Sequence, residues 1–321
     1  MAARMELYCW RDDWGLPSAD MDCLLVLSYA SIARAPLKLR QCCHPWNMPT
    51  RALPTFRCGD DVLSKPMEII RFLRRMGYKP DSHLLAKQEA DVVAFSALIE
   101  QMLLPALLHT FWVDPQNYVE LIRPWYGATM GFPYSLILPY LNRRKVISRL
   151  EFSVGRLPFI TIKETEAQIY RNARECMNLL SHQLGKQDYF FGNLPSTLDA
   201  VVFAHLAPLL RAPLLGRTLQ LHLKALPNLC QHCSRMLNYC FPAQSAEGGS
   251  RPEREQMDAN LQKLTELVNK ESNLIEKMDG NLRANPKSSG QVTALRRAPP
   301  KMEASARVTQ IDWSIQRRLW T

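Results

Sequence analysis

The chain has 321 residues, 47% of them hydrophobic and 22% charged, which is typical of a globular protein with room for two domains. Its net charge is +10, and residues 244–321 hold 13 Lys and Arg against 10 Asp and Glu, which leaves +7 on residues 1–243. No RNP motif or C₂H₂ finger accompanies this charge. A diffuse excess suits an anionic membrane surface or acidic partners, and nucleic-acid binding is not expected.

The N-terminus predicts a chain that is made in the cytosol and stays exposed to it. "MAARMELYCWRDDWG" has no apolar core long enough for a secretory signal. It also carries Glu6, Asp12 and Asp13, which a mitochondrial transit peptide avoids. The nine cysteines all precede residue 241, and an odd count without a signal predicts reduced thiols, most of them buried as small apolar groups.

Residues 5–76 alternate between strand and helix patterns. "MELYCW" (5–10) predicts a buried strand, and a helix follows within 16–33, where Ser18 is a candidate cap. The alternation in "PLKLRQC" (36–42) predicts a half-exposed strand.

A hairpin and a second helix complete this part. "PTFRC", a turn at Gly59-Asp60-Asp61 and "VLS" predict two antiparallel strands. Ser64 is expected to cap the next helix, and Gly77 to end it. The predicted order is therefore βαβ, then a ββ hairpin, then α.

From about residue 83 to residue 241 the patterns predict helices only. The first, "LAKQEADVVAFSALIEQMLLPALLHTF" (85–111), is apolar on nearly every side, which is typical of a central buried helix. Its length also suits a membrane span, but Glu100 near the middle would cost about 2.5–3.5 kcal/mol, so a core helix is expected. Further helices are predicted at 134–152, at 164–184, from Pro195 and at 226–241.

The composition changes at Ala243. "AQSAEGGSRPERE" has the composition of a linker, spaced apolar residues from Met257 to Leu282 predict a short amphipathic helix, and 284–306 are expected to be disordered. The final "RVTQIDWSIQRRLWT" combines an apolar stripe with tryptophan and arginine. It suits an interfacial membrane segment, a docking peptide or an idle tail. The candidate contact residues are Ile311, Trp313, Ile315, Arg317, Arg318 and Trp320.

Two cysteine-containing stretches have part of the ligand pattern of a metal site. "CCH" (42–44) and "CQHC" (230–233) each supply at most half of a zinc site, and no second pair lies at a partner spacing. Cys233 and Cys240 lie seven apart on an apparently helical run, which favours core packing. No metal and no cofactor is predicted.

The element order, with a proline before the third strand and a helical part after it, resembles the glutathione-transferase fold. That α+β fold joins a thioredoxin-like βαβ-ββα domain, here 1–78, to an all-helical domain, here 83–241, followed by the tail 243–321. The resemblance implies a cis peptide bond at Pro54, where the family turns its backbone toward the glutathione site. A second signature is "FGNLPSTLDAVVFAHLAPLL" (191–210), which looks like the family's buried helix with a capping box of Ser196 and Asp199.

Five stretches over residues 1–241 carry a closer resemblance, to the metaxins. This resemblance implies a mitochondrial outer-membrane protein that acts in protein import and in β-barrel assembly at the sorting and assembly machinery. The implied partners are other metaxins, outer-membrane assembly subunits and the membrane surface, with no small-molecule substrate. A glutathione-dependent transferase of the cytosol and an adaptor to motor proteins are the alternatives. The stretches are "MELYCW…WGLPS" (5–18), "LLPALLHTFWVDPQNYVE" (103–120), "FFG" (190–192), "STLDA" (196–200) and "LHLKALPNLCQHC" (221–233).

The residues oppose catalysis in two places. An active transferase needs a hydroxyl or thiol just after the first strand; Tyr8 and Cys9 lie within the predicted strand, and Ser18 is the better candidate. Acidic residues crowd this turn and oppose an anionic ligand such as glutathione; they are Asp12, Asp13, Asp20 and Asp22.

Before the third helix, active relatives carry Glu-Ser and this chain carries Leu63-Ser64. Ser64 is therefore interpreted as a helix cap and Pro54 as a structural relic, with no catalytic residue. No apolar run of eighteen follows residue 241, which predicts attachment to the cytosolic face of the outer membrane through a partner.

Overall fold

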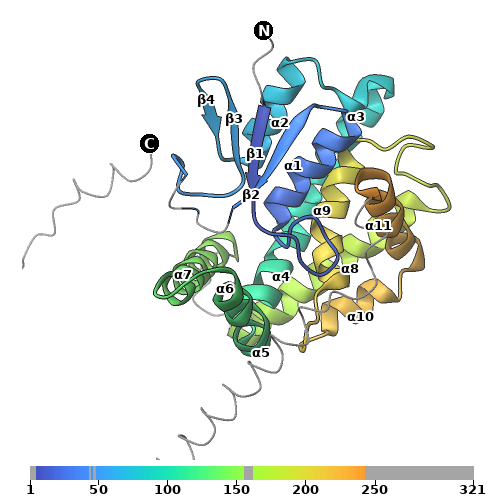
Figure 1. Cartoon of the computed structure of the whole chain (residues 1–321). Coiled ribbons are helices and arrows are strands. Elements are labelled where there is room, and N and C mark those ends of the chain that lie inside the picture. Colours follow the sequence, from blue (N-terminus) through green and yellow to red (C-terminus); the bar gives the residue numbers. More distant parts are fainter. Residues whose placement is uncertain (1–4, 43–44, 46–47, 155–161, 243–321) are drawn as a thin grey trace, which may run out of the picture. The chain divides into compact units, whose positions relative to one another are not determined.

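A four-stranded mixed sheet forms the N-terminal part of the computed structural model, which describes residues 5–42, 45, 48–154 and 162–242 (Figure 1). The strands are β1 (Met5–Cys9), β2 (Leu37–Gln41), β3 (Thr55–Cys58) and β4 (Asp61–Leu63), in the order β2-β1-β3-β4. β1 runs parallel to β2 and antiparallel to β3, so that Leu7 lies between Leu39 and Phe56. Gly59, with φ 61°, opens the predicted β3–β4 turn.

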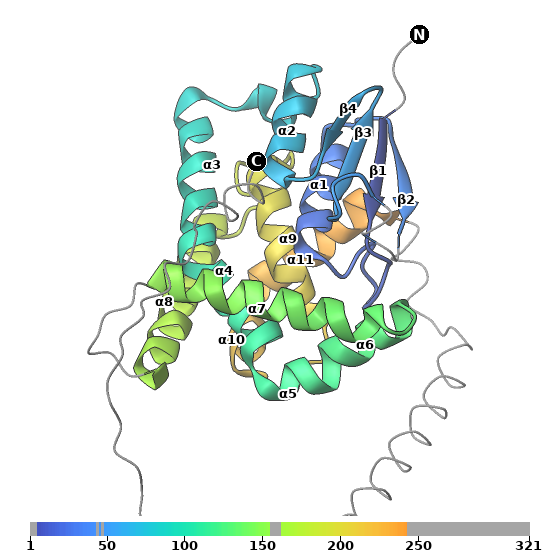
Figure 2. The same ribbon diagram turned by 90° about the vertical axis from the view of Figure 1, so that its left-hand side faces the viewer.

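Two helices cover one face of this sheet. α1 (Met21–Ile32) connects β1 to β2, and α2 (Pro66–Arg75) follows β4 (Figure 2). Leu7, Phe56 and Ile69 are fully buried between the helices and the strands. Gly77 ends α2 with φ 95°, a left-handed conformation that suits glycine. The predicted thioredoxin-like βαβ-ββα order is confirmed.

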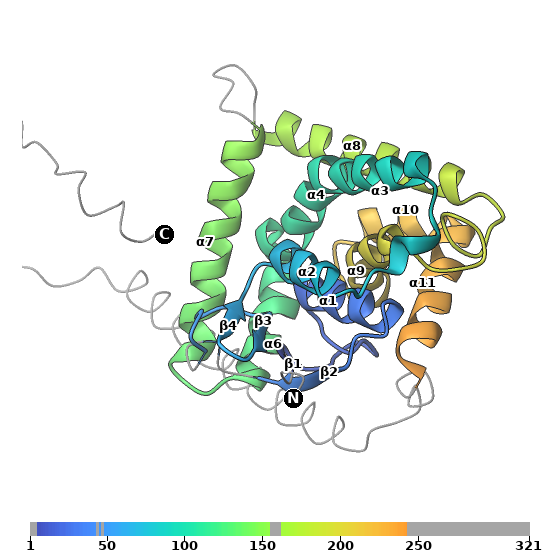
Figure 3. The same cartoon turned by 90° about the horizontal axis from the view of Figure 1, so that it is seen from above.

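The remaining described residues are helical, as predicted. α9 (Thr197–Arg211) is buried along most of its length and packs against α1, α10 and α11, so it joins the sheet layer to the helical layer. α7 lies at the periphery when the molecule is seen from above (Figure 3). The other α-helices are α3 (Ala86–Leu98), α4 (Leu104–Leu108), α5 (Pro115–Asn117), α6 (Arg123–Thr129), α7 (Tyr134–Val154), α8 (Ile162–Leu184), α10 (Thr218–Lys224) and α11 (Pro227–Cys240). A 3₁₀ turn, η2 (Pro80–His83), and three π-turns, η3 (Ile99–Leu103), η4 (His109–Val113) and η5 (Tyr118–Ile122), complete the set.

Both helix caps expected in the sheet domain are wrong. α1 is capped by Asp20, whose carboxylate accepts from the Cys23 amide at 2.9 Å, while the Ser18 hydroxyl accepts from the Asp20 amide at 3.3 Å. α2 begins at Pro66, so its N-cap is Lys65 and Ser64 lies one residue outside. Proline at the first helical position has no amide hydrogen to satisfy and fixes φ near its helical value, so this helix starts without a side-chain cap.

The expected core helix over 85–111 is only half right. It is broken into α3, η3, α4 and η4, and only its second half is largely buried, whereas Val93 on α3 is 69% exposed. Pro105 lacks the amide hydrogen of a regular helix turn, and a π-turn directly precedes α4 at this point. Within the described residues, one helical run, Ala86–Val113, is long and apolar enough to cross a membrane by length and composition, and 28% of its apolar window is buried.

The predictions for the C-terminal tail lie outside the described residues. These are the linker from Ala243, the amphipathic helix over 257–282, the disorder over 284–306 and the contact residues between Ile311 and Trp320.

The N-terminus of α9 is buried and opens with the predicted capping box of Ser196 and Asp199. Asp199 Oδ2 accepts from the Ser196 amide at 2.8 Å and from its hydroxyl at 2.7 Å. Asp199 Oδ1 accepts from the Phe190 amide at 3.1 Å and lies 2.8 Å from His232 Nε2 on α11. This fully buried carboxylate therefore ties together the loop before α9, the helix itself and α11.

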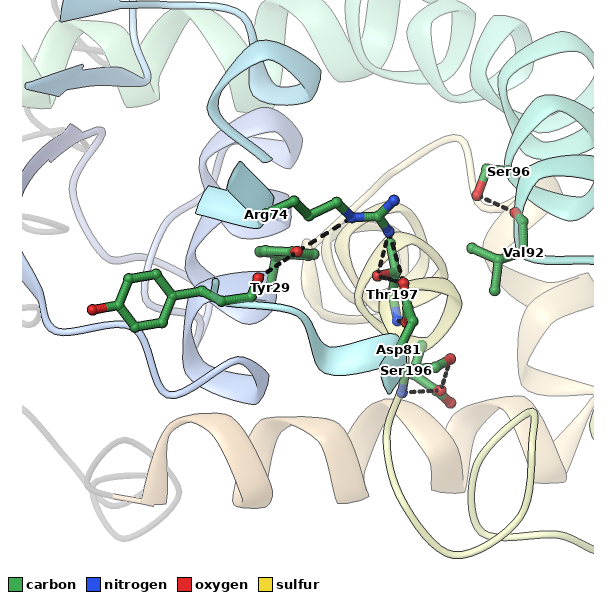
Figure 4. A network of polar contacts seen from close by, with 9 residues as sticks. Tyr29, Arg74, Asp81, Val92, Ser96, Ser196 and Thr197 are labelled. Atoms are coloured by element: carbon green, nitrogen blue, oxygen red, sulfur yellow. Dashed lines mark hydrogen bonds and ion pairs between the residues drawn. The ribbon is translucent and has the colours of Figure 1, made fainter. Parts of the chain in front are cut away.

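A second carboxylate reaches the same helix end from the sheet domain. Asp81 in η2 accepts from the Thr197 amide at 2.7 Å and from the Thr197 hydroxyl at 2.5 Å. Arg74 on α2 donates to Asp81 at 2.7 Å and to Thr197 at 3.0 Å, and its Nε donates to the Tyr29 hydroxyl at 3.3 Å (Figure 4). We call this set of seven residues the α9 junction. It consists of Ser196 and Asp199 together with Tyr29, Arg74, Asp81, Thr197 and His232. It caps α9 from two layers at once.

Loss of Asp199 is expected to cost more stability than loss of Ser196. Ser196→Ala removes one buried hydroxyl that donates to Asp199, at about 1 kcal/mol of unfolding free energy. Asp199→Ala leaves buried donors of Ser196, Phe190 and His232 without an acceptor, at about 3 kcal/mol or more. Urea unfolding of both variants measures the difference, and equal losses would contradict the central place of Asp199. Ser234→Ala, which removes an exposed hydroxyl on α11, is the control and should stay within about 0.5 kcal/mol.

Candidate functional site

The peptide bond between Leu53 and Pro54 is cis, and Pro54 directly precedes β3. The sequence resemblance predicts both features. Pro54 is buried, and the Thr55 hydroxyl donates back to the carbonyl of Ala52 at 2.6 Å. The backbone at this position therefore has the cis form that the resemblance implies.

Aromatic side chains fill the neighbouring region, between the end of β1 and the helical layer. Trp10, which follows β1, lies edge-on to Trp125 and Tyr126 of α6, with ring centroids 5.6 and 5.5 Å away. Trp14 stacks on Phe111 of η4 with centroids at 6.3 Å. We call these five residues the aromatic cluster. It brings the turn after β1 and two segments of the helical layer into contact.

The space that remains in this cluster is small. A cavity of about 60 Å³ is lined by the cluster together with Asp20, Met21 and Trp112, among others. Small-molecule sites usually measure about 300–1,000 Å³. The cavity is therefore far too small to take a tripeptide.

Asp20 places a carboxyl group beside the aromatic cluster. It caps α1 and lines the cavity. Burial, and to a smaller extent the neighbouring Asp22 carboxylate, raises the pKa of Asp20 from 3.8 to about 7. An ionised carboxylate here would repel a thiolate, and Asp20 becomes increasingly ionised as the pH rises above about 7.

None of the three candidate catalytic groups near the first strand is suitably placed. Cys9 and Ser18 are fully buried, and the Tyr8 hydroxyl donates to Glu6 on the same strand at 3.1 Å. Ser64 lies in the β4–α2 connection, directly after Leu63 at the end of β4. No arrangement of nucleophile and base appears among these residues.

The eight described cysteines are free, and six are buried. Burial raises the pKa of the Cys233 and Cys240 thiols to about 12, so both stay protonated and unreactive at neutral pH.

The "CQHC" stretch lies on α11 and its side chains do not converge. His232 Nε2 lies against Asp199, and the Cys230 thiol donates to the Leu223 carbonyl at 3.3 Å. Within the described part of the chain, no group of three or more His, Cys, Asp or Glu side chains is arranged to hold a metal ion.

Of the residues singled out in the sequence, the structure brings Ser196 and Asp199 together, and His232 of the "CQHC" stretch lies against the same carboxylate. Pro54 and Ser64 lie on neighbouring strands at the open end of the β3–β4 hairpin, because the antiparallel register pairs Phe56 with Leu63. Sequence analysis missed Asp81, Arg74 and His232 as members of the α9 junction. The cap of α1 was predicted at Ser18, whereas Asp20 is the N-cap. Asp20 is an equally good cap residue and lies closer to the apolar run.

Residues 23–143 match a family model described as "Outer mitochondrial membrane transport complex protein". Residues 173–236 match "Glutathione S-transferase, C-terminal domain". The chain is 47% identical over 287 residues to Metaxin-3 of Xenopus laevis, which covers 89% of this chain and 93% of that protein. It is 46% identical over 248 residues to Metaxin-1 of Mus musculus, covering 77% and 78%.

A solved structure, that of glutathione transferase GSTFuA3 from Phanerochaete chrysosporium, superposes with a TM-score of 0.50. It covers 74% of this chain and 98% of that chain at 10% identity. A likeness at this identity shows the fold alone, and the predicted glutathione-transferase-like architecture is confirmed.

Asp20 is expected to make stability depend on pH. Its folded-state pKa is about 7 and its unfolded value about 3.9, so the folded protein binds this proton more tightly. The resulting stabilisation is fully present below about pH 4 and is lost as the pH rises through about 7. Asp20→Asn keeps an N-cap acceptor and removes the titration.

Thermal unfolding midpoints at several pH values between 4 and 8 test this expectation. The loss of stability from low to high pH should be smaller in Asp20→Asn than in the parent chain, while other titrating groups contribute equally to both. Asp60→Asn, in the exposed β3–β4 turn, should follow the parent chain. Parallel curves for all three proteins would show that Asp20 does not titrate in this range.

Proposed function

The chain belongs to the metaxin family, and from this membership we propose that it is a non-enzymatic subunit of a protein-import and assembly complex at the mitochondrial outer membrane. The observation that carries the proposal is the extent of the match. Identity of 46–47% extends over 77–89% of the chain, and the outer-membrane transport model spans the junction between the sheet and the helical layer.

A non-catalytic role is supported by how the transferase-like site is filled. Trp10 and Trp14 with their partners take up the region beside the cis Pro54 bond, and Asp20 opposes a thiolate there. We infer that the family fold serves here as a scaffold, in which Pro54 and the α9 junction maintain the packing of the two layers.

We further propose that the protein works on the cytosolic face of the outer membrane and is held there by other metaxins and assembly subunits. The helical run Ala86–Val113 meets the length and composition of a span, but it contains Glu100, paired at 3.7 Å with Arg149 on α7. Moving these two charged side chains from water into lipid would cost free energy, and this cost opposes insertion of the helical run into a membrane.

Affinity purification from gently solubilised mitochondria tests the proposed role. The full tagged chain should recover outer-membrane assembly subunits or another metaxin, and Asp199→Ala should recover less of them because it weakens the fold. A variant ending at residue 242 should show whether the tail contributes to recovery. Recovery of soluble cytosolic proteins alone, by a full chain that is correctly folded, would refute the import role.

Glutathione is not expected to bind. The cavity of about 60 Å³ in the aromatic cluster is too small for the tripeptide, and an ionised Asp20 beside it would repel a thiolate. Calorimetric titration with millimolar glutathione should give no saturable heat, and no conjugation to a chlorinated aromatic should be detected. An active glutathione transferase in the same buffer is the control. Stoichiometric binding would restore the alternative of a glutathione-dependent transferase.

A further inference from the structure

The N-terminal part of α7 presents a concentrated apolar surface. Six large side chains within ten residues are exposed, from 41% for Leu141 to 82% for Phe132. Exposed apolar side chains scattered singly are ordinary, whereas a cluster of this kind usually marks an interaction site. The six are Phe132, Tyr134, Leu136, Ile137, Tyr140 and Leu141.

Contacts on the opposite side of α7 fix its orientation. Pro139 and Leu150 are buried, and the Arg143 guanidinium lies 4.4 Å from the centroid of the Tyr118 ring. Asn142 Nδ2 donates to the Tyr126 hydroxyl at 3.4 Å. α7 packs against α6 and η4 through this side, and it lies at the edge of the helical layer in Figures 2 and 3. The apolar side chains are therefore held away from the core.

The exposed side of α7 is also basic. Tyr134, Ile137, Leu141 and Arg144 follow one another at spacings of three and four residues, which places them along one side of the helix. Arg144 and the adjacent Lys145 are both exposed. Between Glu120 and Glu151 the sequence has five arginine and lysine residues and no acidic residue. The six apolar side chains with Arg144 and Lys145 form what we call the α7 face.

We propose that the α7 face lies on the anionic phospholipid surface of a membrane. Aromatic and aliphatic side chains beside basic ones are the composition of an interfacial helix, which buries its apolar side at the headgroup boundary. The two basic side chains lie one turn beyond the apolar group, where they reach lipid phosphates. Phe132, in the turn that precedes α7, enters the boundary first. The inference rests on the proposed membrane function and gives this rigid part of the fold a direct contact with lipid.

Vesicle flotation with the purified full chain tests the proposal without any partner protein. The chain should float with vesicles of phosphatidylcholine containing about a third phosphatidylserine, and much less with phosphatidylcholine alone. Raising the salt concentration should release it, because screening weakens the attraction of exposed charges. Since this measurement needs no substitution, it is informative even where a variant fails to fold.

Two variants of the α7 face should each reduce binding on the order of tenfold or more. One combines Phe132→Ser, Ile137→Ser and Leu141→Ser, and the other combines Arg144→Glu with Lys145→Glu. The matched controls change exposed residues elsewhere: Val93→Ser, Leu215→Ser and Leu221→Ser in one protein, and Lys186→Glu with Lys224→Glu in the other. Both controls should bind as the parent chain does.

Several outcomes would overturn the proposal. These are no flotation of the parent chain, equal flotation with neutral and anionic vesicles, or α7 variants that bind like the parent. Loss of binding in the apolar variant alone would remove the requirement for anionic lipid. A change in molecular mass by light scattering, without any lipid binding, would instead assign the face to contact between copies of the chain. Recovery of assembly subunits from mitochondria is measured separately, so failure of the lipid contact does not decide the proposed function.

Discussion

The fold depends on satisfying the N-terminus of a buried helix. α9 lies between the sheet layer and the rest of the helical layer, so its first amide groups have no access to water. Asp199 satisfies part of this end from within the helix, and Asp81 satisfies Thr197 from the sheet domain. An unsatisfied buried donor costs about 1–3 kcal/mol. The same hydrogen bonds therefore stabilise the helix and hold the two layers in one arrangement.

The features that resemble a transferase are those of the backbone. The cis Pro54 bond and the α9 capping box remain, and both act on the backbone. The aromatic cluster and Asp20 line the small cavity after β1. This division is what a scaffold requires, because packing between the layers depends on the first set alone.

The predictable parts of the structure were those with local signals. The strand order, the Gly59 turn, the Gly77 helix end and the Ser196–Asp199 box each follow from a few adjacent residues. Asp81 was not predictable, because the contact with Thr197 joins residues 116 positions apart. The apolar pattern over residues 85–111 predicted a helix that is buried throughout, and its first half is exposed. An apolar segment has the same sequence pattern whether neighbouring helices cover it or not. The N-cap of α1 was predictable from Asp20, which is a favoured cap residue, but it was predicted at Ser18.

The exposed side of α7 shows why composition alone hides a surface of this kind. Its apolar residues would suit a core helix, and the sequence gives no sign that only Pro139, Leu150 and a few half-buried positions face inward. Contacts with α6 and η4 decide which side is covered, and they leave aromatic and basic residues together on the other. A core helix would have no use for Arg144 and Lys145 beside that apolar group. A helix resting at a charged lipid boundary has a use for both.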